Sequence, residues 1–89
     1  MSVSDRVANR VGRDFGASAS EVLGALALAE TGNQDVERVH AAIVLMAEGS
    51  VERLWQAVEL SALDWRDVLM NGGLAHGDWP AVLEREFGQ

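Results

Sequence analysis

The stretch Ala41-Ala42-Ile43-Val44-Leu45-Met46-Ala47 contains no polar side chain. Residues in about two turns of an α-helix point in every direction around its axis, so a helix of this sequence has no face for solvent. We therefore expect it to be buried on all sides. The predicted helix covers about residues 34–48, because Asp35 and Glu37 suit the positive end of its dipole and Gly49 is a stop signal.

The segments on both sides of this helix repeat apolar residues at intervals of three and four, as helices do. No segment shows the strict alternation that is typical of a half-buried strand. We therefore predict an all-α fold, a compact bundle of about six short helices around the central apolar helix, in a single domain of residues 1–89. The other expected helices cover about residues 3–14, 19–30, 51–62, 65–72 and 79–87.

Hydroxyl, amide and carboxylate side chains precede these segments and are expected to cap them, because such groups accept hydrogen bonds from the free N–H groups at a helix start. Ser18 is followed by Glu21 at the spacing of a capping box. The other predicted N-caps are Ser2 or Ser4, Asn33, Ser50 and Asp64.

The composition limits the classes of function. Fourteen acidic residues against seven arginines, with no lysine, give a net charge of −7, which repels phosphate backbones and anionic membranes. The absence of cysteine excludes disulfides, thiolate zinc sites and thiol nucleophiles. No apolar run approaches the ~18 residues of a membrane span, and Met1–Arg10 lacks the apolar core of a signal peptide. We expect a cytoplasmic protein that does not bind membranes.

The first fifteen residues differ from the rest of the chain in charge. Residues 1–14 carry a net charge of +1, against −8 for residues 15–89. Apolar side chains recur there every fourth residue, and a short helix cannot bury such a strip by itself. Because the small residues of 15–20 (FGASAS) follow, we expect residues 1–15 to be an association arm that joins two copies into a homodimer. Docking of the arm on its own domain is the alternative. The candidate interface comprises Val3, Arg6, Val7, Arg10, Val11, Arg13, Phe15 and Trp79.

His40 and His76 are the side chains that titrate near neutrality without a shifted pKa, so they are the first candidates for acid–base or metal chemistry. His40 shares a helical face with Val44 and is expected at the edge of the core, bonded by a carbonyl or by water. His76 and Asp78 offer two metal ligands, whereas a closed site needs about four. No serine elbow or phosphate loop is present. We predict no catalytic residue, no cofactor and no metal, and rank an enzyme lowest.

Three tryptophans lie on the apolar faces of the expected helices, and we assign Trp55 and Trp65 to the core. Trp79 is equally suited to the core or to an interface. Residues 64–69 and 78–83 both follow the pattern D-W-x-x-V-L, which we interpret as two similar helix starts.

Residues 51–71 have the outline of a degenerate helix-turn-helix, in which the second helix would contact DNA. The one arginine of this second helix, Arg66, lies between Asp64 and Asp67, which is poor chemistry for a phosphate backbone. We therefore predict a small acidic helical protein that acts through protein–protein contacts, as a homo-oligomer or as an accessory subunit. A nucleic-acid-linked regulator is the alternative.

Overall fold

The computed structural model describes residues 3–32 and 34–88. Most of these residues form helices, which are connected by turns and loops. The elements are α1 (Asp5–Phe15), a 3₁₀ turn η1 (Gly16–Ser18), α2 (Ala19–Ala27), α3 (Val36–Ala47), α4 (Val51–Gly72) and α5 (Trp79–Phe87). No strand occurs in the described ranges, and the all-α prediction is confirmed. Within the same ranges, no helix is long and apolar enough to cross a membrane.

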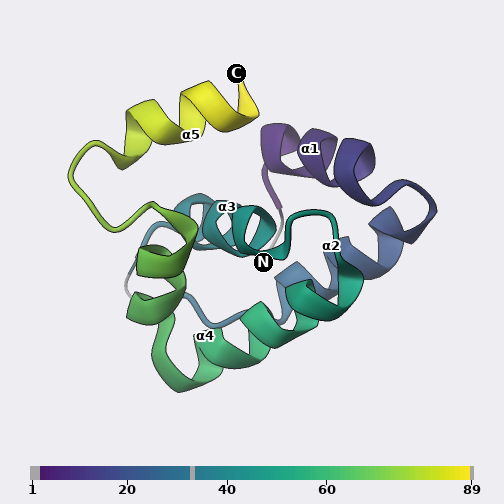
Figure 1. Cartoon of the computed structure of the whole chain (residues 1–89), viewed down its shortest axis with the longest axis horizontal. Coiled ribbons are helices and arrows are strands. Elements are labelled where there is room, and N and C mark those ends of the chain that lie inside the picture. Colours follow the sequence, from purple (N-terminus) through teal and green to yellow (C-terminus); the bar gives the residue numbers. More distant parts are fainter. Residues whose placement is uncertain (1–2, 33, 89) are drawn as a thin grey trace.

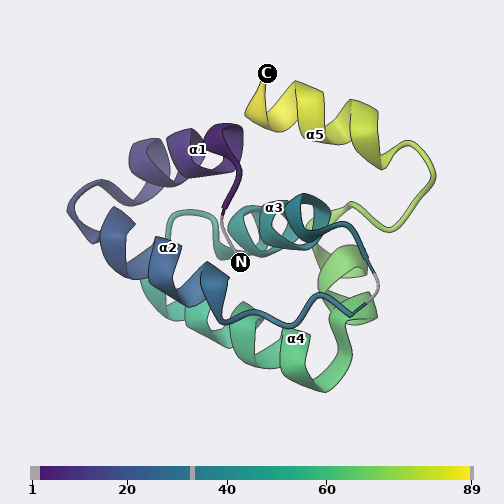
Figure 2. The ribbon, with the colours of Figure 1, turned by 180° about the vertical axis from the view of Figure 1, so that it is seen from behind.

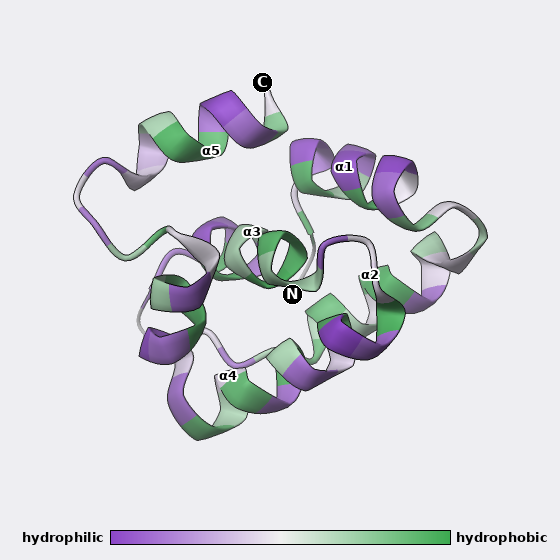
Figure 3. Ribbon diagram, in the orientation of Figure 1, coloured by the Kyte–Doolittle hydropathy of each residue, from purple (hydrophilic) through white to green (hydrophobic). Residues whose placement is uncertain are grey.

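The central position of α3 follows from its sequence. Seven of its twelve residues are buried, and they include the stretch 39–44, which passes through every direction around the helix axis. Helices α1 and α5 cover one side of α3, and α2 and α4 cover the other (Figure 1). Figure 3 shows that the apolar residues of α1 face the middle of the molecule and its polar residues face outward.

The number of helices is lower than the six that we expected, because residues 51–72 form one element instead of two. Helix α4 bends at Asp64, whose φ of −160° and ψ of 96° are not helical. The Asp64 carboxylate accepts a hydrogen bond from the N–H of Arg66 at 3.0 Å, so it caps the second segment as a helix N-cap does. A single residue therefore replaces the expected turn.

The second segment of α4 returns to the central helix and packs tightly on it. A Cβ atom added to Gly72 would lie 2.7 Å from the Cα, the Cβ and the carbonyl oxygen of Ala42. Any side chain at residue 72 would push the two backbones apart. Gly73 follows in the left-handed conformation, with φ of 80°, and ends the helix as predicted.

Besides Asp64, two further predicted N-caps are confirmed. The hydroxyl of Ser4 accepts a hydrogen bond from the N–H of Val7 at 3.4 Å, and the hydroxyl of Ser50 accepts one from the N–H of Arg53 at 3.2 Å. Ser2, the alternative to Ser4, lies outside the described residues.

The other two predicted caps, Ser18 and Asn33, are not confirmed. The capping box is wrong: Ser18 ends the 3₁₀ turn and makes no capping hydrogen bond, and Glu21 instead accepts one from Nε1 of Trp55 at 2.9 Å. Asn33 lies outside the described residues, and the carboxylate of Asp35 caps α3.

We predict that Ile43→Ala lowers the free energy of unfolding by about 2 to 4 kcal/mol, because Ile43 is fully buried and its loss leaves a cavity. Urea denaturation followed by circular dichroism measures this loss. Leu63→Ala is the control, since Leu63 is exposed and its removal should change stability by less than about 0.5 kcal/mol. An equal effect of both substitutions would contradict the central position of α3.

Candidate functional site

The apolar strip of α1 is buried within the chain itself. Val7 and Val11 are fully buried, Phe15 is nearly so, and Val3 is half-buried against the same core. Helix α1 packs on α2, α3 and α5. The chain itself therefore covers the apolar strip of α1, as we had expected a second copy to do.

The connection after α1 also differs from the expected flexible linker. Gly16–Ser18 form a 3₁₀ turn and Ala19 starts α2, so residues 15–20 are part of continuous helical structure. Residues 3–15 of the described chain dock on the same domain, which is the alternative that we gave. Self-association of the chain stays a prediction.

Two of the three arginines of α1 bind the end of α5. Nη1 of Arg10 donates to the carbonyl oxygen of Glu86 at 2.6 Å, and Nη1 of Arg6 donates to that of Gly88 at 3.1 Å. These carbonyls lie at the negative end of the α5 dipole, where a guanidinium is stabilising. The Arg10 guanidinium also lies 5.3 Å from the ring centre of Phe87. Figure 2 shows that the two helices are neighbours.

Arg6 connects α1 to α3 as well. Its Nε and Nη2 donate to the carboxylate of Glu37 at 2.7 and 2.8 Å, a bidentate ion pair. The bond from Arg6 lowers the pKa of Glu37, against the effect of burial, and the hydroxyl of Ser4 acts in the same direction. Arg6 therefore has its partners within the chain.

The start of α5 is held in a similar way. The guanidinium of Arg38 lies 5.1 Å from the ring centre of Trp79, and its Nε donates to the carbonyl oxygen of Leu74 at 2.8 Å. Trp79 is half-buried against the core. Of the candidate interface residues, Arg13 alone is largely exposed, with 72% of its side chain accessible among the described residues.

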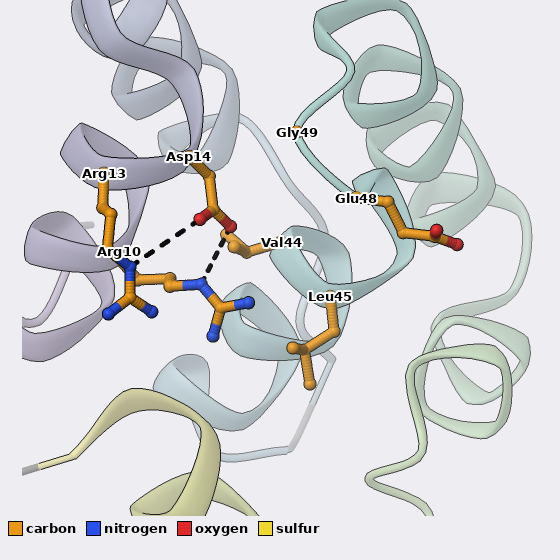
Figure 4. Close-up of a pocket in the computed structure, with 7 residues that line it drawn as sticks. All are labelled: Arg10, Arg13, Asp14, Val44, Leu45, Glu48 and Gly49. Carbon is orange, nitrogen blue, oxygen red and sulfur yellow. Dashed lines mark hydrogen bonds and ion pairs between the residues drawn. The ribbon is translucent and has the colours of Figure 1, made fainter.

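A hollow of about 510 Å³ lies between the ends of α1 and α3 (Figure 4). Its charged groups already bind one another: Nε of Arg10 donates to Asp14 at 2.8 Å, and Nε of Arg13 lies 4.0 Å from the same carboxylate. The hollow is lined by Arg10, Arg13, Asp14, Val44, Leu45, Glu48 and Gly49. It offers room for a small polar group, and its lining includes no histidine or hydroxyl nucleophile.

His40 lies in the core and not at its edge, which corrects our expectation. The residue is 1% exposed, and its Nδ1 has no hydrogen-bond partner among the residues that the structure describes. Burial lowers the pKa of His40, because a charged imidazole loses its hydration there, and the carbonyl of Leu26 acts in the opposite direction. His76 and Asp78 are exposed, and the described residues contain no group of three or more metal-ligating side chains.

We predict that the free energy of unfolding decreases as pH falls below about 6.5, the ordinary pKa of histidine. The reason is that His40 binds a proton in the unfolded chain but stays neutral in the folded chain. Urea denaturation at pH 7.5 and at pH 5.5 measures this change, and both pH values lie above the range in which carboxylates titrate. His40→Gln should remove this loss, and His76→Gln should keep it. An unchanged loss in His40→Gln would contradict the assignment.

We predict that Arg10→Ala costs about 1 to 2 kcal/mol of stability, because a charge-assisted hydrogen bond and a cation–π contact are lost from a partly exposed side chain. Amide hydrogen exchange should increase mainly in α5. Arg13→Ala is the matched control, one helical turn further along, and should leave both quantities unchanged. Equal effects of the two substitutions would contradict the role of Arg10 in holding α5.

The three tryptophans are half-buried at the border of the core, and the assignment of Trp55 and Trp65 to the interior was too deep. The indole of Trp65 lies under the guanidinium of Arg66, at 5.3 Å. The two D-W-x-x-V-L segments are not equivalent: Asp64 caps a helix segment, whereas Asp78 makes no capping hydrogen bond.

The continuous α4 also bears on the predicted helix-turn-helix. Its two segments meet at Asp64 without the turn of three or four residues that the motif uses. The exposed side chains of the second segment include Arg66, Asp67, Met70 and Asn71, so positive and negative charges balance there. The arrangement therefore adds no support to DNA binding.

A surface that the sequence patterns missed carries large apolar side chains. Leu28 is 70% exposed, Leu63 is 85% exposed and Met70 is 67% exposed. A signal was present in the sequence: Leu28 follows the buried Leu26 by two positions, and Leu63 follows the buried Ser61 by two, which places each on the opposite side of its helical turn.

Comparisons of the chain with protein-family models, with curated proteins and with solved structures gave no significant match. The function is therefore argued from the surface and the charges alone.

Proposed function

We propose that this chain is an interaction module that acts by binding another protein, as an accessory subunit or adaptor. The observation that carries the proposal is the exposure of Leu28 and Leu63, which lie on neighbouring segments. The other leucines of the described residues are wholly or partly buried. Covering one leucine side chain contributes about 1.5 to 3 kcal/mol, which favours a partner surface there.

The distribution of charge supports the same function. Five of the seven arginines form ion pairs within the chain, and the other two, Arg38 and Arg66, lie over tryptophan rings. These ion pairs engage four carboxylates, so ten of the fourteen acidic side chains have no ion pair within the described residues. The surface that is available to a partner is therefore acidic, and most arginines already have a partner within the chain. Homodimer formation and a cytoplasmic location both stay predictions.

We predict that the tagged full-length chain, purified from its native host, retains one partner protein in stoichiometric amount. The double variant Leu28→Ser with Leu63→Ser should lose this partner and remain folded, since both side chains are exposed. Met70→Ser is the matched control, because Met70 is similarly exposed but lies beyond the bend of α4. Mass spectrometry identifies the partner and its ratio.

Light scattering on the purified chain separates a hetero-partner from a second copy. If the chain is monomeric and retains no partner in its host, the proposed function is wrong. Retention of the same partner by the double variant would show that another surface binds it.

A further inference from the structure

The segment after α2 runs beside the bend of α4. The N–H of Glu30 donates to the hydroxyl of Ser61 at 3.1 Å. Two residues further on, the backbone of Gly32 abuts the indole of Trp65, where an added Cβ would lie 2.5 Å from Nε1. Residues 28–32 and 61–65 are therefore neighbours, and Leu28 and Leu63 project from adjacent stretches of chain. Figures 1 and 2 show this segment passing α4.

The outward side of α2 adds apolar surface to this place. Gly24, Ala27 and Leu28 are exposed at helical spacing, and no atom lies within 4 Å of a Cβ built on Gly24. On α4, Ala62 and Leu63 are exposed at the bend. We name this surface the α2/α4 face. It consists of two exposed stretches on neighbouring segments, and the open space at Gly24 leaves room for another helix to approach α2 closely.

Carboxylates surround the α2/α4 face. Glu59 precedes Leu63 by one helical turn and shares its strip of α4, and Glu30 follows Leu28 by two residues. Glu21 lies on α2 and accepts a hydrogen bond only from Nε1 of Trp55 among the described residues. None of these three carboxylates has an ion pair within that part of the chain. Helix α4 carries two cations: Arg66 lies over Trp65, and Arg53 forms an ion pair with Glu48.

We propose that the α2/α4 face binds an amphipathic helix of the partner protein, with leucine-like side chains on one side and arginine or lysine along the flanks. This inference rests on the proposed function and adds the chemistry of the partner. Apolar side chains of the partner cover Leu28 and Leu63, and its cations approach Glu21, Glu30 and Glu59. Complementary charge raises the association rate and excludes acidic partners.

A second copy of the chain is a poor occupant of this face. Two copies related by a two-fold axis would bring the same carboxylates together, which costs free energy. Arg6, Arg10 and Arg38 already bind groups within their own chain, and the largely exposed Arg13 belongs to α1 and not to the α2/α4 face. A cationic helix from a different protein meets neither obstacle.

The test uses the full chain and a synthetic amphipathic helical peptide with leucine on one face and arginine on both flanks. Peptide binding should shift the backbone amide resonances of α2 and of the first segment of α4. Fluorescence anisotropy should show a dissociation constant about tenfold weaker for Leu28→Ser with Leu63→Ser, or for Glu21→Gln, Glu30→Gln and Glu59→Gln combined. Met70→Ser should stay within about twofold, and binding should weaken as salt screens the charges.

Two controls make the proposal falsifiable. The same peptide with glutamate in place of arginine, and a random DNA duplex, should leave the spectrum unchanged. Resonance shifts outside the α2/α4 face, equal binding by the triple glutamine variant, or binding of either control would overturn the proposal. If the partner from the native host still depends on Leu28 and Leu63 but not on the three glutamates, the proposed function stands and the cationic partner is wrong.

Discussion

The burial of α3 on all sides is the constraint on which the rest of the fold depends. A helix without a polar face is stable in water only if other elements enclose it, and the described residues form four further helices that do so. Helix α4 bends at Asp64 and returns to α3, where Gly72 meets Ala42. The bend in turn places Leu63 at an exposed corner.

The same enclosure determines how the cations are used. Arg6, Arg10 and Arg38 bind the two ends of α5, a helix with only one fully buried side chain, Leu83, among its described residues. Because apolar burial alone contributes little to this helix, ionic and cation–π contacts hold it in place. The consequence appears on the opposite side of the molecule, where the acidic residues of α2 and α4 have no ion pair among the described residues.

Much of the fold was predictable because it depends on local signals. The apolar run of residues 41–47 indicated the central helix, and Ser4 and Ser50 marked helix starts that the structure confirms. What failed depended on contacts between distant residues. Glu21 fits a capping box by spacing, yet the indole of Trp55, 34 residues away, binds it instead. His40 seemed suited to the edge of the core, and the helices around it cover it completely.

The candidate surface was less predictable than the fold. The strip Val7-Val11-Phe15 has the same pattern whether a second copy or the chain itself covers it, so periodicity cannot separate the two outcomes. The exposure of Leu63 agrees with its position two residues after the buried Ser61, whereas the bend at Asp64 is indicated in the sequence only as a helix start. The neighbouring position of Leu28 requires the path of residues 28–32 along α4, which no local pattern encodes.

The contact of α1 with α5 has a consequence for the order of folding. The hydrogen bond from Arg6 to Gly88 joins residues 82 positions apart, so it closes a loop of almost the whole chain. A ribosome synthesises α1 before α5, and the contact therefore forms only after the helices between them have been made. We expect α1 to α4 to assemble around the central helix before α5 joins them, which leaves the face beneath α5 open to chaperones during synthesis.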